Sequence, residues 1–129
     1  MIICKSFAFA AAHRLPRLPE GHKCSRLHGH TYRVDLECSA SVETVLRSEQ
    51  GWIMDFADIA AAWATVFDLL DHHCLNEVDG LENPTAEHIA AWIYRELRFR
   101  LPLLTAVVLY ESDTTCCRFT HADAIGAPA

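Results

Sequence analysis

Three histidines and a cysteine in the first quarter of the chain have the spacing of a metal centre. His28 and His30 stand two residues apart, and His13 precedes them. If residues 28–40 form a β-strand, these two imidazoles share a face, because side chains two apart in a strand point the same way. Both can then reach one zinc ion at about 2.0–2.1 Å, and His13 completes a three-ligand set. Three protein ligands leave one position open, which is typical of a catalytic zinc site.

Cys24 lies four residues before the histidine pair. A nearby cation lowers the pKa of a thiol, so the pattern favours a Cys24 thiolate. The segment between the histidines is also basic, since it contains a single acid, Glu20, and four basic residues, Arg14, Arg17, Lys23 and Arg26. Such a patch suits a small anionic substrate, such as a phosphorylated metabolite. Ordinary solvated loop charges explain the same composition equally well.

Two predicted strands can position the three histidines. Residues 2–13 are rich in strand formers and end at His13, and residues 28–40 alternate between an apolar and a polar face. An antiparallel pair of these strands, joined by the loop 14–27, brings all three imidazoles to the same end.

Two stretches have the apolar spacing of amphipathic helices. Residues 55–70 begin at a possible N-cap, Asp55, and their apolar stripe starts at Phe56. A second helix is predicted over about 85–100, with Thr85 as its N-cap.

Strands over 104–111 and 115–121 complete the predicted order β-β-α-α-β-β. This is an α+β fold with two helices on one face of a four-stranded antiparallel sheet. We expect a single domain over residues 1–121, followed by a loose tail over 122–129. Because a small sheet with unpaired edge strands needs protection, we also expect a ring-forming homo-oligomer.

Composition excludes several classes of function. The net charge of -6 argues against a nucleic-acid-binding protein. No apolar stretch is long enough for a membrane span, and the first twelve residues do not resemble a secretory signal, so we expect a cytoplasmic protein. The six cysteines, which include no CxxC motif, are expected to be free thiols.

Two further sites are candidates for chemistry. In the pair Asp71-His72 the carboxylate can orient the imidazole, although a polar helix end explains the pair as well. Glu111 ends an apolar strand, and its carboxylate is either solvated or able to accept two parallel N–H donors from a ligand.

In order and spacing, these motifs resemble the family of 6-pyruvoyltetrahydropterin and 6-carboxytetrahydropterin synthases from about residue 2 to 120. The matching segments are 9–15, Cys24 with His28-Gly29-His30, 54–56, 70–72, 83–87 and Glu111. The resemblance implies a tunnelling fold, in which trimers close a twelve-stranded barrel, two trimers stack into a hexamer, and active sites lie between subunits.

The resemblance also assigns roles to residues. It implies that the ion is zinc, with Cys24 as the proton acceptor and with relay or pterin-anchoring places for Glu111 and for His72, held by Asp71. The zinc ligands would be His13, His28 and His30. We expect Thr85 to contact the substrate and the basic loop, including Lys23 and Arg26, to receive a triphosphate.

The bacterial queuosine-pathway members, which this chain resembles in length, convert 7,8-dihydroneopterin triphosphate to 6-carboxy-5,6,7,8-tetrahydropterin and release acetaldehyde and triphosphate. Three alternatives remain open. The first is the sister activity, a triphosphate lyase that yields 6-pyruvoyltetrahydropterin. The second is a non-catalytic module that binds zinc or pterin. The third is a structural zinc site in which Cys24 is the fourth ligand.

Overall fold

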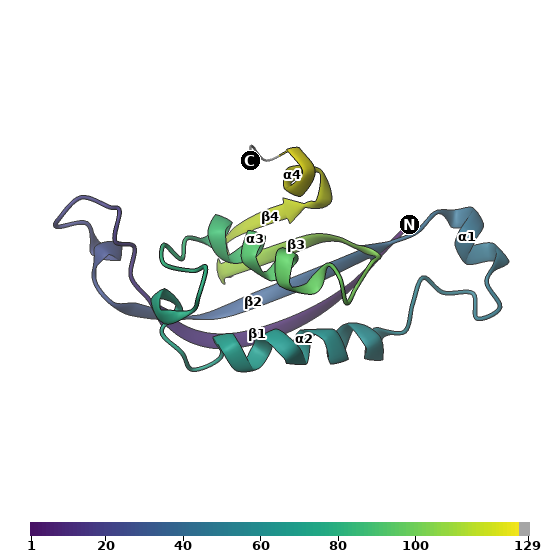
Figure 1. Ribbon diagram of the computed structural model, residues 1–129, viewed down its shortest axis with the longest axis horizontal. Helices are drawn as coiled ribbons and strands as arrows, with labels where there is room; N and C mark the ends of the chain where they lie inside the picture. Colours follow the sequence, from purple (N-terminus) through teal and green to yellow (C-terminus); the bar gives the residue numbers. More distant parts are fainter. Residues whose placement is uncertain (127–129) are drawn as a thin grey trace.

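The chain folds around a four-stranded antiparallel sheet in the order β1-β2-β3-β4 (Figure 1). This computed structural model describes residues 1–126. The strands are β1 (Ile2–His13), β2 (His28–Ser39), β3 (Leu104–Ser112) and β4 (Thr115–Thr120). The helices are α1 (Val42–Arg47), α2 (Phe56–Leu70), α3 (Ala86–Leu97) and α4 (His121–Gly126), with short 3-10 helices η1 (Lys23–Ser25) and η2 (Leu75–Glu77). The predicted α+β fold is confirmed, and the additional short helices were not predicted.

Strands β1 and β2 form a long hairpin whose register decides where the histidines stand. His13 pairs with His28, and Ala11 pairs with His30. Further along the same face, Phe9 stacks on Tyr32 with their ring centroids 4.8 Å apart, and both rings are buried. The three histidines therefore occupy the end of the face that carries the core.

Helices α2 and α3 cover this face of the sheet. Both start at the predicted N-caps, since Asp55 accepts a hydrogen bond from the amide of Ala57 and Thr85 accepts one from the amide of His88. The α2 residues that enter the core are Ile59, Ala62, Trp63, Val66 and Leu70. The predicted stripe was wrong at Phe56, which is the first residue of α2, lies outside the core cluster and is 48% exposed.

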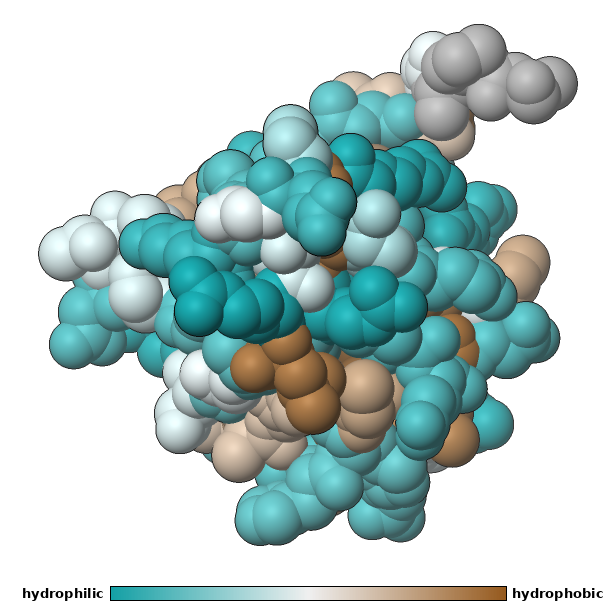
Figure 2. Space-filling model, turned by 90° about the vertical axis from the view of Figure 1, so that its left-hand side faces the viewer, coloured by the Kyte–Doolittle hydropathy of each residue, from teal (hydrophilic) through white to brown (hydrophobic). Residues whose placement is uncertain are grey.

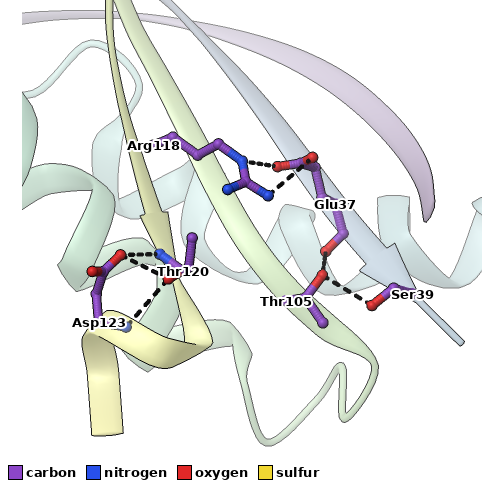
Figure 3. A network of polar contacts seen from close by, with 6 residues as sticks. All are labelled: Glu37, Ser39, Thr105, Arg118, Thr120 and Asp123. Atoms are coloured by element: carbon purple, nitrogen blue, oxygen red, sulfur yellow. Dashed lines mark hydrogen bonds and ion pairs between the residues drawn. The ribbon is translucent and has the colours of Figure 1, made fainter. Parts of the chain in front are cut away.

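Polar side chains connect β2, β3 and β4 (Figure 3). The guanidinium of Arg118 donates to the carboxylate of Glu37 at 2.7 Å, across the intervening strand. Thr105 of β3 donates to the main-chain oxygen of Glu37 at 3.3 Å. Alternation along β2 turns Glu37 away from the buried Leu36, so this ion pair lies on the face opposite the core.

A capping box starts α4. Thr120 accepts from the amide of Asp123 at 3.2 Å, and the Asp123 carboxylate accepts from the amide of Thr120 at 2.8 Å. Hydrogen bonds from the hydroxyl and amide of Thr120 hold the pKa of Asp123 below its usual range. Residues 122–126 are therefore helical, whereas a loose tail was expected there. The rest of that expectation, on residues 127–129, lies outside the described residues.

None of the helices in the described part of the chain has the length and apolar character that a bilayer span requires.

Candidate metal centre and active-site cleft

The predicted convergence of three imidazoles is confirmed. One ring nitrogen from each of His13, His28 and His30 lies within 4.8 Å of the other two. The ring centroids are 4.5 Å apart for His13 and His28, 5.1 Å for His13 and His30, and 5.0 Å for the pair on β2. The hairpin register produces this cluster directly, because it sets the end of β1 opposite the start of β2.

Hydrogen bonds to carbonyl groups orient two of the rings. His13 Nδ1 donates to the carbonyl of Pro84 at 2.8 Å, and His28 Nδ1 donates to the carbonyl of Arg26 at 2.7 Å. A carbonyl oxygen only accepts, so Nδ1 carries the proton in each ring, and in the neutral ring Nε2 then bears the lone pair. Metal-binding histidines are commonly held in this way, with one ring nitrogen donating to a carbonyl.

His13 differs from His28 and His30 because it is buried. Its side chain is 1% exposed, and its Nε2 is buried without a hydrogen-bond partner among the described residues. Burial also lowers the pKa of His13, which favours the neutral ring that a metal requires. An unpaired buried acceptor costs about 1–3 kcal/mol, and an ion on Nε2 would remove that cost. The three nitrogen donors fit zinc, which binds imidazole in tetrahedral sites.

A cleft of about 410 Å³ opens beside this cluster. His28 and His30 line it together with Lys23, Cys24 and Glu111. Cys24 is half-buried on η1, and Glu111 is half-buried near the end of β3. The fold thus brings the predicted cysteine, lysine and carboxylate to one cavity next to the imidazoles.

A second cleft of about 280 Å³ shares Glu111 with the first. Its lining includes Thr85 and Glu87 from the start of α3, and Cys116 and Cys117 from β4. Glu111 therefore stands between the two clefts. The Thr85 hydroxyl already accepts from the amide of His88 at 3.2 Å, but it still lines a cavity.

Most of the loop between β1 and β2 is solvent-exposed, and Figure 2 shows a largely hydrophilic surface at that end of the molecule. Arg14, Arg17 and Arg26 are all exposed, and none of them lines the cleft beside the histidines. Arg26 contributes its carbonyl to His28 instead. Of the basic residues predicted to contact the substrate, Lys23 alone lines that cleft.

Asp71 and His72 form the predicted pair, but neither residue lines the cleft beside the histidines. The Asp71 carboxylate accepts from the amide of Ala10 at 2.9 Å and from His72 Nδ1 at 2.7 Å. These two hydrogen bonds, that of Ala10 first, lower the pKa of Asp71. His72 has a φ of 58°, in the left-handed region that few non-glycine residues adopt, and its side chain is 81% exposed.

The structure does not bring His72 to the histidine cluster of the same chain. His72 lines a cavity of about 550 Å³ whose lining also includes Ala10, Ala12 and one member of the cluster, His30. The amide of His72 donates to the carbonyl of Ala10 at 2.6 Å, so His72 lies beside β1, an edge strand of the sheet. Its ring is not among the three whose nitrogens converge.

The segment after α2 holds the end of β1 in place. The amide of Ala12 donates to the carbonyl of His73 at 3.0 Å. Asn76 binds both backbone groups of Arg14, because its Oδ1 accepts from the amide at 2.9 Å and its Nδ2 donates to the carbonyl at 2.8 Å. Sequence reasoning missed both Asn76 and the carbonyl of Pro84. The segment 71–84 therefore fixes the backbone next to His13.

Comparisons with known proteins show which family this chain resembles. A family model described as 6-pyruvoyl tetrahydropterin synthase matches residues 2–122. The chain is 42% identical over 120 residues to a 6-carboxy-5,6,7,8-tetrahydropterin synthase of Synechocystis sp., and the match covers 92% of each protein. It is 41% identical over 98 residues to a putative protein of that name from Archaeoglobus fulgidus, covering 75% of this chain and 76% of the relative.

Solved structures support the fold. The structure of 6-pyruvoyl tetrahydropterin synthase from Caenorhabditis elegans aligns with a TM-score of 0.82 and covers 93% of this chain and 94% of its own. The two sequences are 22% identical, so this likeness supports the arrangement of strands and helices alone.

Proposed function

Because this chain belongs to the 6-pyruvoyl tetrahydropterin synthase family, we propose that it converts 7,8-dihydroneopterin triphosphate to 6-carboxy-5,6,7,8-tetrahydropterin, with release of acetaldehyde and triphosphate. The names of the two relatives described above support this product. The observation that carries the proposal is the single cleft in which Cys24 and Glu111 stand beside the three imidazoles.

The resident ion in this proposal is zinc, held by His13, His28 and His30. The unpaired Nε2 of the buried His13 and the carbonyl-bound Nδ1 of two rings support this set. A bound zinc supplies Lewis-acid polarisation of a substrate oxygen.

Cys24 is the proposed general base. Its thiol lines the cleft and is half-buried, so a substrate in the cleft can come within reach of it. As a thiolate it removes a proton from the side-chain carbon next to the pterin ring. Lys23 lines the same cleft, and its positive charge can bind phosphate.

Glu111 is the proposed anchor of the pterin. Its carboxylate has two oxygens that can accept the paired N–H groups on the aminopyrimidine edge of the substrate. Its position between the two clefts allows the ring to lie toward Thr85 while the side chain points to Cys24. Anchoring of this kind lowers the barrier by holding the reacting carbon near the base.

His72 and Asp71 complete the site from a second copy of the chain in this proposal. Within one chain His72 lies beside the edge strand β1 and outside the histidine cluster, so its proposed relay role requires an active site between subunits. The proposed assembly is a hexamer made of two trimers. Size-exclusion chromatography with light scattering tests it, and a monomer at micromolar concentration would contradict it.

The proposed location is the cytoplasm, where thiols stay reduced. The free state of all six cysteines, Cys24 included, supports it.

The test uses zinc-loaded protein, 7,8-dihydroneopterin triphosphate and product identification by mass spectrometry. We expect acetaldehyde and the 6-carboxy product. A 6-pyruvoyl product would instead assign the sister activity, for which the description of the family model is the supporting observation. Absence of turnover would indicate a binding module.

Cys24→Ala should keep its zinc and lose about 100-fold or more in turnover, because a general base contributes about that much. The matched control is Cys4→Ala, which removes an exposed thiol outside the cleft and should leave turnover unchanged. Near-normal turnover of Cys24→Ala would remove Cys24 from the mechanism.

A further inference from the structure

Cys24 is carried by a single 3-10 turn, η1, whose N-cap is a histidine. The amide of Cys24 donates to Nδ1 of His22 at 3.1 Å. His22 has extended backbone angles, φ -67° and ψ 132°, as N-cap residues do. An amide N–H only donates, so Nδ1 of this ring bears a lone pair, and the neutral ring carries its proton on Nε2.

Two further hydrogen bonds hold Cys24 and the turn that carries it. The amide of Leu15 donates to the Cys24 carbonyl at 2.8 Å, and this joins the two ends of the loop. The hydroxyl of Ser25 donates to the carbonyl of His22 at 2.6 Å. Both backbone groups of Cys24 are therefore bound, and the His22 ring is the side chain that binds the amide.

A turn of three residues has little intrinsic stability, because 3-10 hydrogen bonds are poorly aligned and short helices lack cooperativity. The N-cap bond of His22 is one of the few hydrogen bonds that hold η1, and it is the one that a side chain makes to the amide of Cys24. A thiolate base must lie within hydrogen-bond reach of the carbon-bound proton, and small displacements of such groups cost rate steeply.

We propose that His22 is a positioning residue for Cys24, acting as the acceptor that caps η1 and not as a carrier of protons. The inference rests on the proposed function, in which Cys24 is the base. It predicts that the atom at the Nδ1 position matters and that the rest of the ring does not.

The test replaces His22 in two ways. His22→Ala removes the acceptor, whereas His22→Asn places an amide oxygen where Nδ1 stood, and asparagine is among the best N-caps. The control is Ser41→Ala, which removes an N-cap bond of the same length, 3.1 Å, from α1, a helix at the other end of the molecule (Figure 1).

We expect His22→Ala to lower kcat by about fivefold, which is the rate factor that corresponds to the stabilisation by a typical N-cap. The zinc content of this variant should stay unchanged. His22→Asn should recover to within about twofold of the wild type. Hydrogen exchange at the Cys24 amide, followed by NMR, should accelerate in His22→Ala and return in His22→Asn. Ser41→Ala should change neither quantity.

Wild-type kcat in His22→Ala would overturn the proposal, as would a His22→Asn variant as slow as His22→Ala, because the ring itself would then be needed. An unchanged exchange rate at the Cys24 amide in His22→Ala would show that His22 does not cap η1 in solution. This readout does not depend on turnover, so a failure of the proposed function, seen as an inactive wild type, is distinguishable from a failure of the cap.

Discussion

The hydroxyl of Tyr32 gives a stability prediction that follows from the packing around the metal centre. Tyr32 is fully buried, its ring centroid is 5.8 Å from that of His13 and 5.4 Å from that of His30, and its hydroxyl has no hydrogen-bond partner among the described residues. Burial and the nearby negative charge of Glu111 raise the pKa of this phenol, so it is neutral. The hydroxyl is therefore desolvated without compensation.

Removing this group should stabilise the fold. An unpaired buried polar group costs about 1–3 kcal/mol, and part of any gain is lost to the small void that a missing oxygen leaves. We expect Tyr32→Phe to raise the free energy of unfolding by about 1 kcal/mol and Tm by about 3–5 °C for a domain of this size. Urea denaturation of the metal-free protein, followed by circular dichroism, measures the change.

Tyr94→Phe is the matched control. Tyr94 is also buried, at 2% exposure, but its hydroxyl is hydrogen-bonded to Nδ1 of His121 at 2.7 Å. Its loss should lower the free energy of unfolding by about 0.5–1.5 kcal/mol. If Tyr32→Phe destabilises the protein as Tyr94→Phe does, the Tyr32 hydroxyl has a partner in solution and the reasoning fails.

Three other substitutions test the site and its supports. His13→Ala should reduce bound zinc, measured by elemental analysis after gel filtration, from about one ion per chain to almost none, because two imidazoles remain; retention of the ion would place the metal elsewhere. Asp71→Asn should remove a pH-dependent stabilisation. The folded-state pKa of Asp71 is lowered, so its contribution is present above the ordinary value of 3.8 and is lost as the pH falls through the lowered folded-state value. Urea midpoints of wild type and variant should therefore converge as the pH falls through and below 3.8, and a constant difference would contradict this. Thr85→Ala should cost about 1 kcal/mol of unfolding free energy through loss of the α3 cap, while Thr85→Ser should cost little; equal losses in both would exclude capping as the cause.

Alternation of side chains made the hairpin and the histidine cluster predictable. Register followed from polarity, because a shift of one residue would turn Tyr32 and Val34 from the core to the solvent. With that register, His13 and His28 must meet at the end of the pair. Local rules also sufficed for the starts of α2 and α3, where Asp55 and Thr85 act as predicted.

Other features depend on contacts between distant segments and have no local signal. The carbonyl of Pro84 reaches His13 across 71 residues of sequence, and the position of His72 depends on how the chain after α2 meets β1. Helix α4 is different, since Thr120-x-x-Asp123 is a capping-box pattern and was available in the sequence.

X-ray absorption spectroscopy at the zinc edge of the metal-loaded protein tests the central claim most directly, because it reports which atoms bind the ion. The account predicts nitrogen and oxygen neighbours at about 2.0–2.1 Å and no sulfur, since the histidines hold the ion and Cys24 stays free to act as a base. A sulfur neighbour at about 2.3 Å would contradict it. Cys24 would then be the fourth ligand of a closed, structural site.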